Sequence, residues 1–317
     1  MDQNKNNYHG LFLVKKDPGM TSHDVVYRLR KILATPSIGH SGTLDPIAEG
    51  LLILLVGEAT KLSQYILEGN KSYLLEMQLG IRTDTFDITG EKLEEKPVDI
   101  STDLIRTLAS QFSGEKEWNV PIHSAVKVKG KKLYEYAREQ KEIIPPKKIM
   151  KFWDVEFIHR EGDFVRFHLH CSKGSYIRTW IQEFGLSLGC GATMTKLIRT
   201  SSVPFHVDQA SSLEEIDQAI KAKTMLSCFI PLEQALPQSK KIRVKGQDQR
   251  LLKNGQISHD LKLQLIQVCN PETDRLIVAT SVELEPLALI GFEPEVGFLI
   301  RRVFHFEASK NLALNKF

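Results

Sequence analysis

The chain has 317 residues, of which 42% are apolar, and a formal net charge of +3. This length suits two domains, one of them large, and the apolar fraction is enough to bury a core, which excludes a disordered or low-complexity protein. The four cysteines are widely spaced and form no C-x-x-C pair, so neither a disulfide framework nor a zinc site is indicated.

The N-terminal ten residues are polar and lack the apolar run of a signal peptide. The longest apolar stretch, residues 51–56, is six residues long and far too short to span a membrane. We therefore expect a cytoplasmic protein without a membrane segment.

The first predicted element is a short buried strand at residues 11–14. Thr21 and Ser22 can cap a following helix, whose apolar face would consist of Val25, Val26, Leu29 and Leu33. A loop punctuated by glycines covers residues 39–50 and leads into a buried strand at residues 51–56.

Alternating apolar residues predict further strands at residues 73–79 and 165–171. Residues 101–112 predict a capped amphipathic helix, and residues 177–188 have helical spacing of apolar side chains. Because few βαβ units of regular length occur, the pattern favours an α+β fold over a doubly wound parallel sheet. We expect a mixed, mostly antiparallel sheet with flanking helices.

The chain changes character after Pro231. Residues 232–236 are a short helix candidate, and residues 237–241 form a polar linker. Strand-like runs follow at residues 264–269, 276–280 and 297–304, separated by turn residues. These features predict a large domain at residues 1–236 and a small, mostly β domain at residues 242–317.

Positive charge is concentrated in residues 120–151, which hold nine Lys or Arg side chains against three Glu. The segment therefore carries +6, which leaves −3 for the rest of the chain. Such a concentration is typical of a surface that binds a polyanion, although a solvated loop has the same composition. Charge alone does not decide between the two.

The loop at residues 39–50 carries the most informative chemistry. Its sequence is Gly-His-Ser-Gly-Thr-Leu-Asp-Pro-Ile-Ala-Glu-Gly, and the proline after Asp45 biases that residue away from helical geometry. A carboxylate presented by a tight loop can act as a nucleophile at a sugar carbon. Capping of the turn is the structural alternative. A P-loop requires a lysine after its glycines, and this loop has none.

As a whole this loop resembles the signature of the TruB-type pseudouridine synthases, which isomerise uridine-55 in the T-loop of tRNA. Five further segments resemble the same family in order: Lys71–Tyr73, Gly80–Asp87 with Gly90, Ser124–Arg138, Gly174–Thr179 and Leu197–Thr200. The resemblance covers about residues 10–205. For the remainder it implies, more loosely, a PUA-like RNA-binding domain.

The resemblance implies three catalytic residues. Asp45 would be the nucleophile that helps to detach the base, and Arg178 its ion-pair partner. Tyr73 would stack on the flipped base and is proposed to act as a base, a role for which a phenol with an ordinary pKa near 10 needs help from its surroundings. From the residues alone, Tyr73 also fits one apolar face of a strand, and Arg178 an ordinary helix surface.

The resemblance also implies residues that bind the substrate. Leu197 would form a wall of the uracil pocket, although a plain core residue would look the same. His40 would fill the space left by the flipped nucleotide. Lys16, Tyr176 and Lys127 would contact the RNA. The implied partner is the T-arm of tRNA, bound by a monomer, and the isomerisation needs neither cofactor nor metal.

Four positions depart from the family pattern. Lys16 is followed by Asp17 before the Pro-Gly pair, Val120 and His123 replace the usual residues before Ser124, and Val203 stands where glycine is common. The final domain matches the family least, and its tail at residues 307–317 has no assigned role.

Other interpretations remain open. His168 and His170 lie on one strand face, as metal ligands can. The chain could also be a non-catalytic RNA-binding or tRNA-folding protein, or a nucleosidase, which usually needs a second carboxylate placed as an acid.

Overall fold

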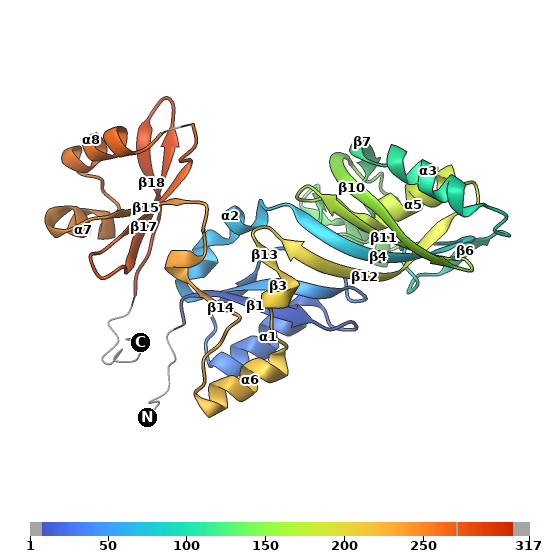
Figure 1. Cartoon of the computed structure of the whole chain (residues 1–317), viewed down its shortest axis with the longest axis horizontal. Coiled ribbons are helices and arrows are strands. Elements are labelled where there is room, and N and C mark those ends of the chain that lie inside the picture. Colours follow the sequence, from blue (N-terminus) through green and yellow to red (C-terminus); the bar gives the residue numbers. More distant parts are fainter. Residues whose placement is uncertain (1–7, 271, 307–317) are drawn as a thin grey trace.

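A computed structural model describes residues 8–270 and 272–306 (Figure 1). Most of the polar N-terminal segment and the whole tail at residues 307–317 lie outside the described residues. No helix in the described part of the chain is long and apolar enough to cross a membrane.

The strands of the large unit are β1 Gly10–Lys16, β2 Ile38–His40, β3 Glu49–Val56, β4 Lys71–Leu79, β5 Ile81–Thr83, β6 Lys92–Glu95, β7 Gly114–Asn119, β8 Lys127–Val128, β9 Lys131–Lys132, β10 Lys147–Glu161, β11 Phe164–Cys171, β12 Ala192–Ser202, β13 Phe205–His206 and β14 Phe229–Pro231. Its helices are α1 Ser22–Leu33, α2 Ser63–Leu67, α3 Thr102–Gln111, α4 Leu133–Arg138, α5 Ile177–Ser187 and α6 Leu213–Ala222. Short 3₁₀ turns are η1 Gly57–Leu62, η2 Val207–Gln209 and η3 Leu232–Gln234.

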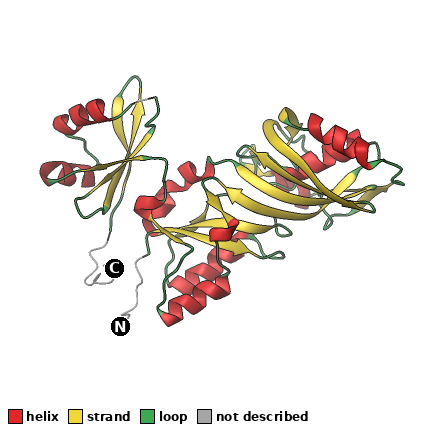
Figure 2. Ribbon diagram, in the orientation of Figure 1, coloured by secondary structure: helices red, strands yellow, loops and turns green. Residues whose placement is uncertain are grey.

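One large mixed sheet forms the centre of this unit (Figure 2). Its strands follow the order β14-β1-β3-β12-β4-β11-β10-β7, with β2 paired to β3 and β13 to β12. Every pairing in it is antiparallel except that of β3 with β12. The mixed, mostly antiparallel α+β prediction is confirmed. The parallel pairing brings the end of the 39–50 loop beside the end of β12.

Helices cover different parts of the sheet (Figure 1). At one end α1 and α6 lie side by side, and at the other α3 packs on β10 and α5 on β12. Within α5 the rings of Trp180 and Phe184 stack on each other, and both contact Phe167 of β11 edge to face. This aromatic cluster anchors the N-terminal end of α5, where Arg178 lies.

Local sequence accounts for the helix boundaries. Thr21 and Asp24 form the capping box that starts α1, and Ser101 caps α3. The helices predicted in the large unit up to residue 188 and the strands of residues 11–14, 51–56, 73–79 and 165–171 are confirmed within two residues at each end. Residues 232–234 form only a 3₁₀ turn, and the glycine-rich segment contains the short strand β2.

Beyond residue 239 a second sheet forms, with the order β15-β16-β17-β18. Its strands are β15 Lys240–Arg243, β16 Leu276–Thr280, β17 Pro286–Glu293 and β18 Gly297–Val303, and helices α7 Gly246–Lys253 and α8 His259–Val268 flank it. A separate apolar cluster fills this unit; it includes Leu252, Leu261, Leu265, Ile277 and Phe298. Figure 1 shows it set apart from the main sheet, in orange and red.

One strand predicted for this unit was wrong. Residues 264–269 are the end of α8 and the residue after it. A short apolar run fits either a strand or a buried helix. Here Ser258 caps a helix whose Leu261 and Leu265, four residues apart, both point into the core.

Candidate active site

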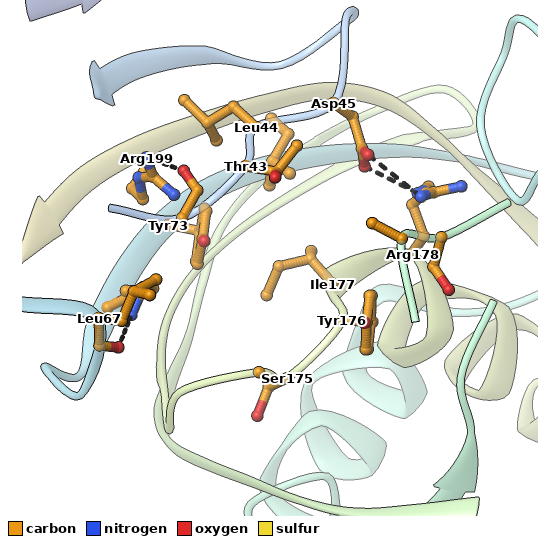
Figure 3. A pocket seen from close by; sticks show the side chains of 16 residues that line it. Thr43, Leu44, Asp45, Leu67, Tyr73, Ser175, Tyr176, Ile177, Arg178 and Arg199 are labelled. Atoms are coloured by element: carbon orange, nitrogen blue, oxygen red, sulfur yellow. Dashed lines mark hydrogen bonds and ion pairs between the residues drawn. The ribbon is translucent and has the colours of Figure 1, made fainter. Parts of the chain in front are cut away.

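A cavity of about 260 Å³ opens where the 39–50 loop, β4, the end of β12 and the start of α5 meet (Figure 3). Its lining consists of Gly42, Thr43, Leu44, Asp45, Leu67, Lys71, Tyr73, Ser124, Ala125, Gly174, Ser175, Tyr176, Ile177, Arg178, Leu197 and Arg199.

Asp45 and Arg178 pair with each other on one side of this cavity (Figure 3). The Nε of Arg178 lies 2.8 Å from Oδ2 of Asp45, and its Nη2 donates to Oδ1 at 3.1 Å. This two-pronged geometry is the strongest that a guanidinium makes with a carboxylate. The Arg178 side chain is 6% exposed and that of Asp45 32%, so the carboxylate is the member of the pair that a ligand can reach.

Arg178 is held by other groups as well. It donates to the backbone carbonyls of Thr85 at 3.0 Å and His123 at 2.9 Å, and its Nη1 lies 3.8 Å from the buried carboxylate of Asp87. Asp87 itself accepts from the backbone N–H of Thr89. Because Thr85, Asp87 and His123 all hold the guanidinium, the paired carboxylate of Asp45 has a fixed orientation.

Tyr73 lies opposite this pair, buried on β4, and its cross-strand partner on β12 is Arg199. The Arg199 guanidinium hydrogen-bonds the hydroxyl of Tyr73. Burial raises the pKa of Tyr73 to about 12, although the positive charge of Arg199 opposes the rise. At neutral pH the phenol therefore keeps its proton.

Arg199 is a site residue to which the sequence assigned no role. Its guanidinium is buried and donates to the carbonyls of Leu51 at 2.7 Å and Gly42 at 3.3 Å. It thus ties the 39–50 loop to Tyr73. Gly50 permits the close approach of the Arg199 backbone in the pairing of β3 with β12, since its φ is +99° and a Cβ there would lie 2.4 Å from the Arg199 carbonyl oxygen. The matched segment Leu197–Thr200 was the available signal.

Lys16 contacts the backbone of the 39–50 loop and is not part of the cavity lining. Its ammonium donates to the carbonyls of Asp17 at 2.9 Å, Pro46 at 3.2 Å and Ala48. Burial lowers the pKa of Lys16 to about 8. In this structure it holds the backbone that follows Asp45, whereas the sequence suggested a contact with RNA.

The other residues expected to bind substrate divide into two groups. Tyr176 and Leu197 line the cavity with the three expected catalytic residues, and burial raises the pKa of Tyr176. His40 and Lys127 lie outside the lining. His40 is on β2, where burial and then Arg199 lower its pKa and keep the ring neutral. Lys127 is exposed on β8, in the basic segment.

The departures from the family pattern leave the Asp45–Arg178 geometry intact. His123 contributes its backbone carbonyl, which any residue supplies, and the Asp17 carbonyl accepts from Lys16. Val120 is buried, and its N–H donates to Pro146. Val203 lines a separate cavity between the two units rather than this one.

The histidine pair does not gather further ligands. The rings of His168 and His170 contact each other edge to face, and His170 also stacks on Trp153. Within residues 8–270 and 272–306, no three His, Cys, Asp or Glu side chains group as metal ligands would.

Similarity to known proteins covers nearly the whole chain. Residues 30–177 match the N-terminal domain of the TruB family of pseudouridylate synthases, and residues 178–237 match the tRNA pseudouridylate synthase B C-terminal domain. A tRNA pseudouridine synthase B of Bdellovibrio bacteriovorus is 56% identical over 305 residues, or 96% of this chain and 99% of the relative. That of Bacillus subtilis is 41% identical over 235 residues, 72% of this chain and 76% of its own.

Among solved structures, a Cbf5-Nop10-Gar1 complex contains a chain with the same fold at a TM-score of 0.66 and 24% identity, over 94% of this chain and 84% of that one. The chain matches both family domains and is 56% identical to the Bdellovibrio protein over nearly its full length. It therefore belongs to the TruB family of pseudouridylate synthases.

Proposed function

We propose that the protein isomerises uridine-55 in the T-loop of tRNA to pseudouridine, with Asp45 as the nucleophile. The observation that carries this proposal is the aimed carboxylate of Asp45, held by Arg178 at a cavity opposite Tyr73. Membership of the TruB family and the names of the relatives, tRNA pseudouridine synthase B, support the substrate.

The target uridine must leave its stack to enter the cavity. The Asp45 carboxylate then attacks C1′, and the electron pair of the C1′–N1 bond leaves with the uracil. The detached base turns until C5 faces C1′, and the new C1′–C5 bond displaces the carboxylate. Loss of the C5 proton and protonation of N1 complete the product. Because the product is an isomer, the reaction consumes no cofactor or donor.

Other residues of the cavity fit the handling of the base. Tyr73 and Leu197 offer an aromatic ring and an apolar wall to a planar uracil, and Tyr176 stands beside the entering nucleotide. Because the Tyr73 phenol is protonated, we assign its ring the role of stacking on the base. For Tyr73 also to remove the C5 proton, Arg199 must offset the rise that burial causes in the pKa of the phenol.

The proposal extends to the rest of the tRNA. His40 would replace the flipped nucleotide, and Lys127 with the basic segment at residues 120–151 would contact the phosphates of the T-arm. We assign residues 1–236 to catalysis and 242–317 to a PUA-like module that binds RNA away from the target. We further propose that the enzyme acts as a cytoplasmic monomer.

The direct test is to incubate the full chain with an unmodified tRNA and map pseudouridine along it. We expect pseudouridine at position 55 alone and release of tritium from RNA labelled at C5 of uridine. Binding of tRNA without tritium release would mean a non-catalytic RNA-binding protein. Free uracil among the products would mean a nucleosidase.

A further inference from the structure

Lys148 differs from the neighbouring lysines of β10 in the direction of its side chain. Lys147 and Lys151 lie on one face, each with its ammonium 3.8 Å from a glutamate of β7, Glu117 and Glu115. Because side chains alternate along a strand, Lys148 shares the opposite face with the fully buried Met150 and Phe152. Its ammonium makes no ion pair or hydrogen bond with any residue that the structure describes.

The Lys148 side chain passes over Gly174, which lines the cavity. A Cβ at Gly174 would lie 2.0 Å from Nζ and 3.2 Å from Cε of Lys148, and the glycine has a φ of +70°. Backbone contacts hold the two segments together, since the Ser172 N–H donates to the Lys151 carbonyl at 2.9 Å. The ammonium therefore lies against Gly174, a residue of the cavity lining, in the space that a side chain at position 174 would enter.

The other cations around the cavity are already engaged. Arg178 pairs with Asp45, and Lys173 pairs with Glu68 at 3.1 Å. Lys71 and Arg199 are buried and donate to backbone carbonyls. Lys148, beside the lining residue Gly174, therefore differs from these cations in having no anionic or carbonyl partner among the residues that the structure describes.

We propose that Lys148 binds a backbone phosphate of the RNA directly next to the flipped target nucleotide. This inference rests on the proposed function. When C1′ of the target reaches Asp45, the phosphates that flank this nucleotide lie near the edge of the cavity, and Gly174 and Ser175 are part of the cavity lining. An ammonium beside Gly174 is a point charge suited to a phosphate oxygen. Lys148 is in this sense a positioning residue, because it does not touch the reacting atoms.

The test compares Lys148→Met, which keeps most of the side-chain stem, with Lys147→Met, which removes a charge that Glu117 already offsets. For Lys148→Met we expect KM for tRNA to rise about five- to tenfold with kcat within about twofold, and the slope of log affinity against log salt to fall by about one unit. Lys147→Met should show a much smaller change, and Lys148→Arg should restore most of the loss.

The same comparison on a minimal stem-loop that carries the target uridine locates the contact. The Lys148→Met defect should persist there, because the phosphate adjoins the target. Loss of the defect on the stem-loop, an unchanged salt slope, or equal effects of Lys147→Met and Lys148→Met would overturn the inference. A fall in kcat and in melting temperature without a change in slope would show a structural role instead. Failure of the proposed function is distinct, since the unmodified protein would then form no pseudouridine at all.

Discussion

At the scale of single residues, buried cations bound to backbone carbonyls hold the site in shape. Lys16 and Arg199 each donate to carbonyls within or just after the 39–50 loop. A carbonyl contact does not depend on the side chain of the accepting residue. The loop can therefore be fixed by these two side chains while the half-buried carboxylate of Asp45 still lines the cavity.

Replacement of Asp45 by asparagine tests the nucleophile. The amide keeps the shape of the carboxylate but not its charge, so turnover should fall below detection while tRNA affinity stays within about a few-fold. Single-turnover tritium release and a binding titration measure the two effects. Asp103→Asn, at an exposed carboxylate of α3, is the matched control. Appreciable residual turnover in a clean preparation would reject the role of Asp45.

The buried ammonium of Lys16 predicts a pH dependence of stability. The folded chain releases its proton near pH 8, whereas the unfolded chain keeps it to the ordinary value of 10.5. Between these values the unfolded state binds more protons, so the contribution of Lys16 to stability becomes more favourable as pH rises from about 8 to 10.5. Below pH 8 both states are protonated and the burial cost is present in full.

Urea unfolding of the natural chain and of Lys16→Met at pH 7.5 and 9.5 measures this effect. The difference in free energy of unfolding should shift by about 1–2 kcal/mol in favour of the natural chain at the higher pH. Lys15→Met, at the exposed neighbouring position, controls for the loss of a surface charge. A difference that does not vary with pH would mean that Lys16 is not desolvated.

At the scale of elements, residues 127–138 of the basic segment form a small hairpin and a helix, and its last residues, 147–151, begin β10. β8 and β9 pair with each other, and α4 follows at once. Part of its charge is offset, since Lys131 pairs with Glu139, while the rings of Tyr134 and Tyr136 lie under lysine ammonium groups. Lys127 at the start of the hairpin is exposed.

Reversal of Lys127, Lys131 and Lys132 to glutamate should weaken tRNA binding and flatten its salt dependence, by up to about three units of slope. Affinity measured over a range of salt concentrations provides the slope. Reversal of Lys221 and Lys223, at the end of α6, is the control and should change the slope far less. If the triple variant kept the natural slope, the segment would face solvent in the complex.

At the scale of the whole molecule, polar contacts and buried apolar side chains join the two units. The apolar side chains of the second unit that belong to the main core cluster are Val278, Leu289 and Phe304. Lys61 donates to the Val303 carbonyl at 2.8 Å, Arg302 donates to the Lys61 carbonyl at 3.3 Å, and the His305 N–H donates to Glu58 at 2.7 Å. All three lie on η1 and the end of the second sheet, away from the cavity lining. The second unit therefore has no direct part in the geometry around Asp45.

A chain that ends at Ser239 should remain folded and still modify tRNA at saturating substrate. Loss of an RNA-binding module lowers the effective concentration of the target, so the apparent KM for tRNA should rise far more than kcat falls. On a minimal stem-loop the two proteins should perform alike, because the distant contacts are absent from both. If the shortened chain is folded by circular dichroism yet has no turnover on the stem-loop, the module must help to build the active site.

The sequence by itself determined most of the local structure. Thr21 and Ser101 mark the starts of their helices, and the alternation at residues 165–171 marks a strand, because capping and periodicity act within a few residues. The resemblance of the 39–50 loop and of the segments around Tyr73 and Arg178 pointed to three residues that line one cavity. The roles of these three residues were expected only from the resemblance to the family.

Only the tertiary structure decided the rest. The parallel pairing of β3 with β12 sets Arg199 against Gly50, and residues about 150 positions apart in sequence leave no periodic signal of such a contact. The resemblance implied that Lys16 contacts RNA, and only the structure shows that its ammonium lies among the carbonyls of the loop. Residues 264–268 belong to α8 because Leu261 and Leu265 of this helix pack into a core with Ile277 and Phe298, which the short apolar run alone does not reveal. In each case the deciding partner is distant in sequence, or is a backbone group that carries no residue identity.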